Sequence, residues 1–208
     1  KTIAVTSSEP MEGKTTTVIN LAVTFAQMGS RVLLIDADFR KPKIHNIFWY
    51  SNETGLTNFL ASHEDYSKYV RHSEITNLDV LTSGTIPPNP SELLETNAMK
   101  AFIRKAREEY DLVLLDTPPV GSVTDASIVS TYVDGIILVA HSGKVRIESL
   151  KRAKELLYKV NANIIGVVLN KLDRKARRNY YYYQYDYAGD TKVRRKRPQN
   201  GESNMKSD

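Results

Sequence analysis

The loop after the first apolar run contains residue types that suit phosphate binding. Gly13, Lys14 and Thr15 open a predicted helix directly after the strand-like residues 2–6. A glycine lets backbone N–H groups approach a phosphate, a lysine reaches the β- and γ-phosphates, and a threonine hydroxyl binds Mg²⁺. We interpret this as the second half of a Walker A loop, with an ordinary helix start as the alternative. The expected nucleotide-binding residues of the loop are Ser8, which replaces the motif's usual first glycine, Glu12, Gly13, Lys14, Thr15 and Thr16.

Three aspartates follow apolar runs and could hold a metal ion. Asp36 and Asp38 end the second run, and side chains two residues apart on an extended strand point the same way. Asp116 ends another run, which is the Walker B arrangement. Carboxylates crowded beside a buried strand are unfavourable without a cation. We therefore expect Thr15, Asp36, Asp38 and Asp116 to hold Mg²⁺, with solvated loop aspartates as the alternative.

Asn170 ends the last apolar run and opens the sequence Asn-Lys-Leu-Asp. Asn-Lys-x-Asp is the guanine-reading pattern of GTPases, but those proteins have Asp-x-x-Gly where this chain has Asp116-Thr-Pro-Pro. We therefore interpret Asn170 as a contact to the base and favour adenine over guanine. A helix-capping role at the strand exit is the alternative.

The elements that must position these residues alternate between strand and helix. Strands are predicted at residues 2–6, 31–36, 78–81, 112–115, 135–140 and 164–169, and helices at 14–29, 91–109 and 147–160. This pattern predicts an α/β fold of the P-loop NTPase type, with an open, mostly parallel sheet and helices on both faces. Ligands of such sheets bind beyond the C-terminal ends of the strands, where all the residues above are expected.

Charge and tyrosine are concentrated at the C-terminal end of the chain. The chain has a net charge of +5 and 12 tyrosines, but residues 171–208 alone carry a net charge of +6 and six of the tyrosines. Residues 174–208 have few aliphatic side chains, so we predict a mobile basic tail after a domain of residues 1–173. The chain has no cysteine, which excludes disulfides and thiolate chemistry, and no apolar run long enough to span a membrane.

These motifs together resemble those of bacterial tyrosine kinases of the capsule and exopolysaccharide type, within the deviant P-loop ATPases that include MinD and ParA proteins. Residues 7–15 match the Walker A motif, residues 34–42 the additional Walker A′ motif, and residues 114–119 the Walker B motif. The segments 55–60 and 83–94 and the tyrosine cluster 180–187 also fit the resemblance. Two features differ: Met11 stands where members often have glycine, and the chain contains no E-x-x-R-x-x-R helix.

The resemblance implies a protein-tyrosine kinase that uses ATP and Mg²⁺. It implies that Lys14 and Arg40 belong to the catalytic residues, that Asp36 acts as the base on the tyrosine hydroxyl, and that Asp38 completes the metal site. The phosphate acceptors would be tail tyrosines presented to a neighbouring subunit, namely Tyr180, Tyr181, Tyr182, Tyr183, Tyr185 and Tyr187.

The resemblance also implies partners and a location. It implies the cytoplasmic segment of a membrane adaptor, self-association through the tail tyrosines and a cognate tyrosine phosphatase, whereas nucleic acid is not expected. The kinase would lie in the cytoplasm, peripheral to the inner face of the plasma membrane through the adaptor, and regulate synthesis and export of capsular or exopolysaccharide.

Two rival interpretations follow from the same residues. A partitioning or division-site ATPase would use the basic residues 194–197 to bind DNA or acidic lipid. Such ATPases usually carry a second lysine early in the Walker A loop, where this chain has only Glu9 and Glu12 as charges before Gly13. An inert interaction module conflicts with the intact Lys14 and with the three aspartates. Asp125 is open to two interpretations, a place near the Walker B loop or a cap of the following helix.

Overall fold

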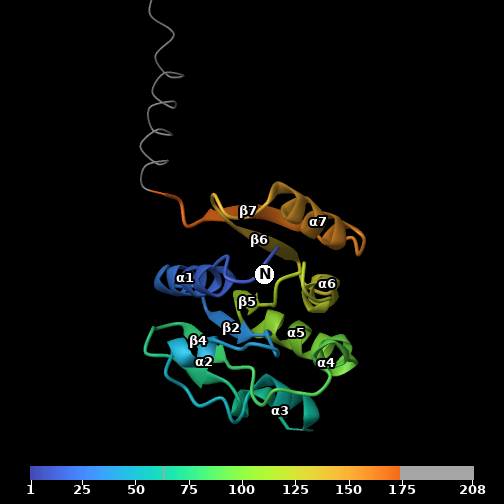
Figure 1. Ribbon diagram of the computed structural model, residues 1–208. Coiled ribbons are helices and arrows are strands. Elements are labelled where there is room, and N and C mark those ends of the chain that lie inside the picture. Colours follow the sequence, from blue (N-terminus) through green and yellow to red (C-terminus); the bar gives the residue numbers. More distant parts are fainter. Residues whose placement is uncertain (63, 174–208) are drawn as a thin grey trace, which may run out of the picture. The chain divides into compact units, whose positions relative to one another are not determined.

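The computed structural model describes residues 1–62 and 64–173. In this part of the chain seven strands form one sheet in the order β3-β4-β2-β5-β1-β6-β7 (Figure 1). All neighbouring strands are parallel except β3 and β4, which are antiparallel. The strands are β1 (Thr2–Ser7), β2 (Val32–Asp36), β3 (Arg71–His72), β4 (Leu78–Leu81), β5 (Leu112–Asp116), β6 (Gly135–His141) and β7 (Ile164–Asn170).

The central strands are apolar on both faces because helices cover both. Every residue of β2 and of β5 is buried, as expected for inner strands of a parallel sheet. β1 lies between β5 and β6, so Thr2 pairs with Val113 and Ile3 with Gly135. The predicted α/β fold with an open, mostly parallel sheet is confirmed.

The helices divide between the two faces of the sheet (Figure 1). On one face, α1 (Lys14–Gln27) and α2 (Ile44–Ile47) pack against the sheet through one apolar cluster, which includes Val18 and Ile44. On the other face a second apolar cluster packs against the sheet, and it includes Phe102 of α5 (Asn97–Glu109). The remaining helices are α3 (Leu56–Ala61), the 3₁₀ helix η1 (Tyr66–Lys68), α4 (Pro90–Glu95), α5 (Asn97–Glu109), α6 (Asp125–Ser130) and α7 (Ile147–Tyr158).

The single helix predicted at residues 91–109 is wrong, since the structure has α4 and α5 there. Thr96 separates them because its hydroxyl accepts a hydrogen bond from the N–H of Met99, as the residue at a helix start does. Pro90, which lacks an N–H, occupies the first position of α4. The helices α2, α3 and α6 and the strand β3 were not predicted, because segments of two to six residues show no reliable periodicity.

The end of α1 agrees with the prediction. Gly29 has a φ of 95°, in the left-handed region that glycine adopts readily, and its N–H donates to the carbonyl of Ala26. None of the helices within the described ranges is long and apolar enough to cross a bilayer. The predicted tail, with its tyrosine cluster, lies outside the described residues.

Candidate active site

The loop between β1 and α1 is fastened by the carboxylate of Glu12. Its Oε2 accepts hydrogen bonds from the hydroxyl of Ser8 at 2.8 Å and the N–H of Glu9 at 2.9 Å, and its Oε1 accepts from the N–H of His141 in β6 at 3.3 Å. Gly13 has a φ of 97°, which an L residue rarely adopts, and so allows the turn into α1. Glu12 and Ser8 thus hold the loop in place, and a direct contact of either to a nucleotide stays a prediction.

Lys14 and Thr15, at the start of α1, meet the aspartates of the two other motifs. Lys14 Nζ lies 2.9 Å from Asp38 Oδ2 and 3.5 Å from Asp116 Oδ1. The Thr15 hydroxyl donates to Asp116 Oδ2 at 2.6 Å. Burial opposes the charge on Lys14, but Asp116 and Asp38 outweigh burial and raise the lysine pKa above its ordinary value. The structure therefore brings the three motifs together at the C-terminal ends of β1, β2 and β5.

Asp36 and Asp116 are neighbours on adjacent strands and both are buried. They are direct partners in the pairing of β2 with β5. Burial, followed by the charge of Asp116, raises the pKa of Asp36 to about 7. Burial also raises the pKa of Asp116 to about 6, against the lowering effect of Lys14. Both ionised carboxylates are thus destabilised, and a bound divalent cation would relieve this.

Asp36 also holds the segment that follows it. Its Oδ2 accepts hydrogen bonds from the N–H groups of Lys43 and Ile44, both at 3.0 Å, and its Oδ1 accepts from the N–H of Asp38 at 3.2 Å. The carboxylate therefore fixes the start of α2 and the Walker A′ loop. The sequence did not indicate this structural role, and the role of Asp36 as a base stays a prediction.

Mg²⁺ fits the oxygen atoms that meet here. Mg²⁺ prefers oxygen ligands and, beside phosphates, takes only one or two protein carboxylates and keeps several waters. The hydroxyl of Thr15 and the carboxylate of Asp116 are buried side by side and suit that role. The described ranges contain no cluster of three or more acidic or histidine side chains arranged to hold a metal ion. Joint ligation by Asp36, Asp38 and Asp116 therefore stays a prediction.

Comparisons with known proteins identify the family of this chain. A family model described as AAA domain matches residues 1–166. The tyrosine-protein kinase YwqD of Bacillus subtilis is 45% identical over 183 residues, which cover 87% of this chain and 77% of YwqD. The chain belongs to the bacterial tyrosine-protein kinases.

Solved structures confirm the fold of this kinase. The kinase domain of the Escherichia coli tyrosine kinase ETK superposes with a TM-score of 0.81 at 38% identity, covering 84% of this chain and 69% of that one. MinD of Pyrococcus horikoshii, solved with Mg-ADP, superposes with a TM-score of 0.70 at 23% identity, covering 84% of this chain and 71% of MinD. The second likeness shows that the kinase has the fold of MinD-like P-loop proteins.

Arg40 of the kinase is bound by groups outside the loop between β1 and α1, which we call the phosphate loop. Its guanidinium donates to Asp125 through Nε at 2.9 Å and through Nη2 at 3.0 Å, and Nη2 also donates to the hydroxyl of Ser91 at 2.9 Å. The Ser91 hydroxyl donates in turn to Asp125 at 2.8 Å. Asp125 is fully buried in the first turn of α6, so Arg40 ties the Walker A′ segment to α4 and α6. The pairing with Arg40 explains how the carboxylate of Asp125 can be buried. A catalytic role of Arg40 stays a prediction.

Asn170 of the kinase packs against the phosphate loop. Its Nδ2 donates to the carbonyl of Glu12 at 3.0 Å, and its Oδ1 accepts from the N–H of Lys171 at 2.8 Å. A Cβ atom at position 13 would lie 2.1 Å from Asn170 Nδ2, so this contact requires glycine at that position. Contact of Asn170 with adenine stays a prediction.

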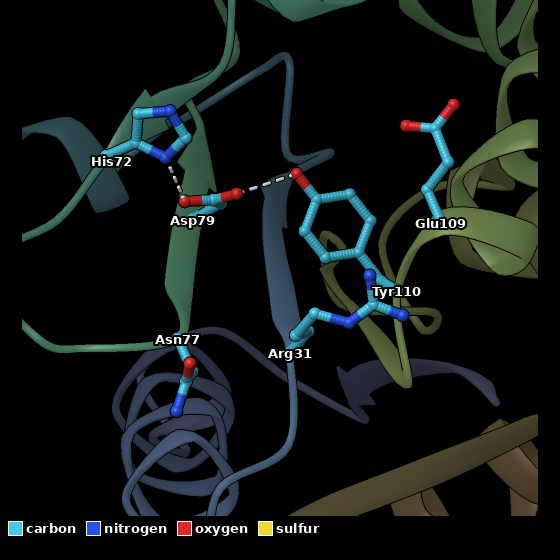
Figure 2. Close-up of a pocket in the computed structure, with 6 residues that line it drawn as sticks. All are labelled: Arg31, His72, Asn77, Asp79, Glu109 and Tyr110. Atoms are coloured by element: carbon cyan, nitrogen blue, oxygen red, sulfur yellow. Dashed lines mark hydrogen bonds and ion pairs between the residues drawn. The ribbon is translucent and has the colours of Figure 1, made fainter.

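A hollow of about 520 Å³ lies at the opposite end of the strands from the candidate active site (Figure 2). Three of its polar side chains bond to one another: Asp79 accepts from the Tyr110 hydroxyl at 2.8 Å and lies 2.6 Å from His72 Nδ1. Burial and the bond to Asp79 raise the pKa of Tyr110. The hollow is lined by Arg31, His72, Asn77, Asp79, Glu109 and Tyr110. Arg31 and Asn77 precede β2 and β4, so the hollow lies where those strands begin. The candidate active site, in contrast, lies where the strands end.

Proposed function

We propose that this kinase transfers the γ-phosphoryl group of ATP to tyrosines of its own tail, presented by a neighbouring copy. In this proposal residues 1–173 are the catalytic domain and residues 174–208 carry the acceptors. The observation that supports it most is the set of hydrogen bonds by which Lys14 contacts Asp38 and Asp116 and Thr15 contacts Asp116. These groups supply one cation for the phosphates and oxygen ligands for Mg²⁺.

Phosphoryl transfer needs positioning and charge neutralisation more than covalent help from the protein. Lys14 would leave Asp38 to hold the β- and γ-phosphates, and Thr15 and Asp116 would hold Mg²⁺, which neutralises charge on the phosphates when bound. A tyrosine oxygen would attack the γ-phosphorus while the bond to the β-phosphate oxygen breaks and ADP leaves. The phenol proton would pass to a carboxylate, for which Asp36 is our candidate.

The proposed acceptors form a compact group in the sequence. Six tyrosines lie within residues 180–187, and the next residues include the basic run 194–197. Arginine and lysine near the acceptors offer partners for the added phosphates. An acceptor in a tail can reach the site of another copy, which a tyrosine inside the packed domain cannot do.

We further propose where the kinase acts and what it contacts. Its family resemblance supports a place in the cytoplasm at the inner face of the plasma membrane, where the cytoplasmic segment of an adaptor would activate it. A cognate tyrosine phosphatase would reverse the modification. The phosphorylation cycle would regulate synthesis and export of capsular or exopolysaccharide.

The proposal is tested by incubating the full chain with Mg²⁺-ATP and the adaptor segment. Mass spectrometry should find phosphotyrosine within residues 180–187 of the wild-type protein. Lys14→Met should abolish it, because the phosphates lose their cation, and Lys159→Met, which removes an exposed charge after α7, should leave it unchanged. Absence of tail phosphotyrosine, together with ATP hydrolysis stimulated by DNA, would contradict the proposal and favour a partitioning ATPase.

A further inference from the structure

Two peptide groups of the phosphate loop have their carbonyls bound from outside the loop. The carbonyl of Met11 accepts a hydrogen bond from Lys171 Nζ at 2.9 Å, and the carbonyl of Glu12 accepts from Asn170 Nδ2 at 3.0 Å. The carbonyl and the N–H of one trans peptide point in opposite directions. The N–H groups of Glu12 and Gly13, which belong to these two peptides, therefore point away from Lys171 and Asn170.

These two N–H groups are available to a ligand. Within residues 1–62 and 64–173, no hydrogen-bond acceptor is found for the N–H of Glu12 or of Gly13. A phosphate-binding loop works by presenting such groups to the anion, and their orientation must be set before the anion arrives if binding is to be tight. Whatever holds the two carbonyls thus controls the orientation of the phosphate-binding N–H groups.

The backbone at both ends of the Lys171 contact is in an uncommon conformation. Met11 has a φ of 66° and Lys171 a φ of 54°, and both values lie in the left-handed region that residues other than glycine rarely adopt. Such conformations persist only where the surroundings fix them, and they concentrate at functional sites. Here the two strained residues are joined to each other by a hydrogen bond, although one belongs to the loop and the other follows β7.

We propose that Lys171, together with Asn170, is a positioning residue of the phosphate loop. It holds the Met11 carbonyl outward and so aims the Glu12 N–H at the nucleotide phosphates. Lys171 also lies over the loop, with its Cε 3.9 Å from the point a Cβ at position 13 would occupy. This inference rests on the proposed nucleotide binding and adds to it a group from the end of β7 that keeps the loop in its binding conformation despite the strain at Met11.

The test measures the affinity of the full chain for Mg-ADP and for pyrophosphate with Mg²⁺. Lys171→Met keeps most of the side chain but removes the ammonium, and should weaken both affinities about threefold to tenfold. Lys171→Arg should restore most of the affinity because it can donate to the same carbonyl. Lys144→Met is the matched control: the charges of Lys171 and Lys144 both act on His141, yet no bond from the Lys144 side chain is found within the described ranges. It should change either affinity less than twofold.

The following outcomes would overturn the inference. Equal losses for Lys171→Met and Lys144→Met would leave only a general effect of charge. No loss for Lys171→Met would mean that its bond to the Met11 carbonyl does not orient the loop. A loss for Mg-ADP without a loss for pyrophosphate would mean that Lys171 contacts the nucleoside instead of orienting the loop. A fall in the unfolding midpoint of nucleotide-free Lys171→Met by more than about 5 °C would indicate a role in general stability. A wild-type protein that binds neither probe would overturn the proposed function itself, and the inference with it.

Discussion

The ion pair of Arg40 and Asp125 connects a motif residue to a helix far along the chain. Asp125 is fully buried, and an ionised carboxylate inside a protein is tolerated only with charged or hydrogen-bonding partners. Arg40 supplies both, through two parallel hydrogen bonds, and Ser91 supplies a third. The hydrogen bond to Asp125 in turn raises the pKa of Arg40. The pair therefore stabilises the Walker A′ loop that carries Asp36 and Asp38.

Asp125→Asn should lower the free energy of unfolding by about 1–3 kcal/mol, because Arg40 loses its counter-charge and one of its two acceptor atoms. Urea denaturation measures this directly. Glu64→Gln serves as the control, since it removes the carboxylate from an exposed pair with Lys68 and should leave the urea midpoint where it is. Equal midpoints for Asp125→Asn and wild type would show that the pair contributes nothing to stability.

At the scale of the elements, α1 is flanked by two glycines that have nearly the same φ. Gly13 has a φ of 97° and Gly29 a φ of 95°. Their surroundings differ: a Cβ at position 13 would lie 2.1 Å from Asn170 Nδ2, whereas a Cβ at position 29 would have no atom within 4 Å. The two positions therefore separate the effect of backbone strain from the effect of crowding.

Gly29→Ala should cost only the strain of a left-handed alanine, about 1 kcal/mol of unfolding free energy. Gly13→Ala should cost at least about 1 kcal/mol more, because the methyl group displaces Asn170 from the Glu12 carbonyl. Thermal or urea denaturation of both variants provides the comparison. Equal losses would mean that Asn170 moves aside without cost.

The sequence predicted the elements with long periodic patterns and the residues at their ends. The C-terminal ends of β1, β2 and β5 were predicted to bring Lys14, Thr15, Asp38 and Asp116 together, and the structure places them there. The structural roles of Glu12, Asp125 and Lys171 were not predicted, because each includes a contact to a residue at least 85 positions away. Such contacts follow from how the strands are ordered in the sheet, which residue spacing alone does not specify.

At the scale of the whole molecule, the candidate active site contains buried carboxyl groups whose ionisation affects the stability of the fold. Asp36 and Asp116 come from strands 80 residues apart in sequence, yet lie side by side in the sheet. Burial raises the pKa of Asp36 from its ordinary 3.8 to about 7 and that of Asp116 to about 6. A carboxyl group whose pKa is raised by folding binds its proton more tightly in the folded state, so folding is favoured while it is protonated.

Without Mg²⁺ and nucleotide, the stability of the protein should therefore fall as the pH rises from about 5 to about 8. The gain from the raised pKa values is full below the unfolded value near 3.8 and is lost as the pH passes through about 6 and 7. We expect a loss of about 1–3 kcal/mol in the unfolding free energy, measured by urea denaturation in EDTA. Saturating Mg-ADP should reduce this loss, because a cation favours the ionised carboxylates. A rise in stability over the same range without ligand would contradict the assignment.

The position of β1 in the middle of the sheet has a consequence for synthesis on the ribosome. β1 leaves the ribosome before β5 and β6, and its partners Val113 and Gly135 follow more than a hundred residues later. Pairing across such a separation requires closing a long loop, which slows folding. We therefore expect the phosphate loop after β1 to form only once β5 and β6 have left the ribosome. A nascent chain that stops before β6 would have its Walker A residues but no nucleotide site, and would expose the apolar side chains of β1 to chaperones.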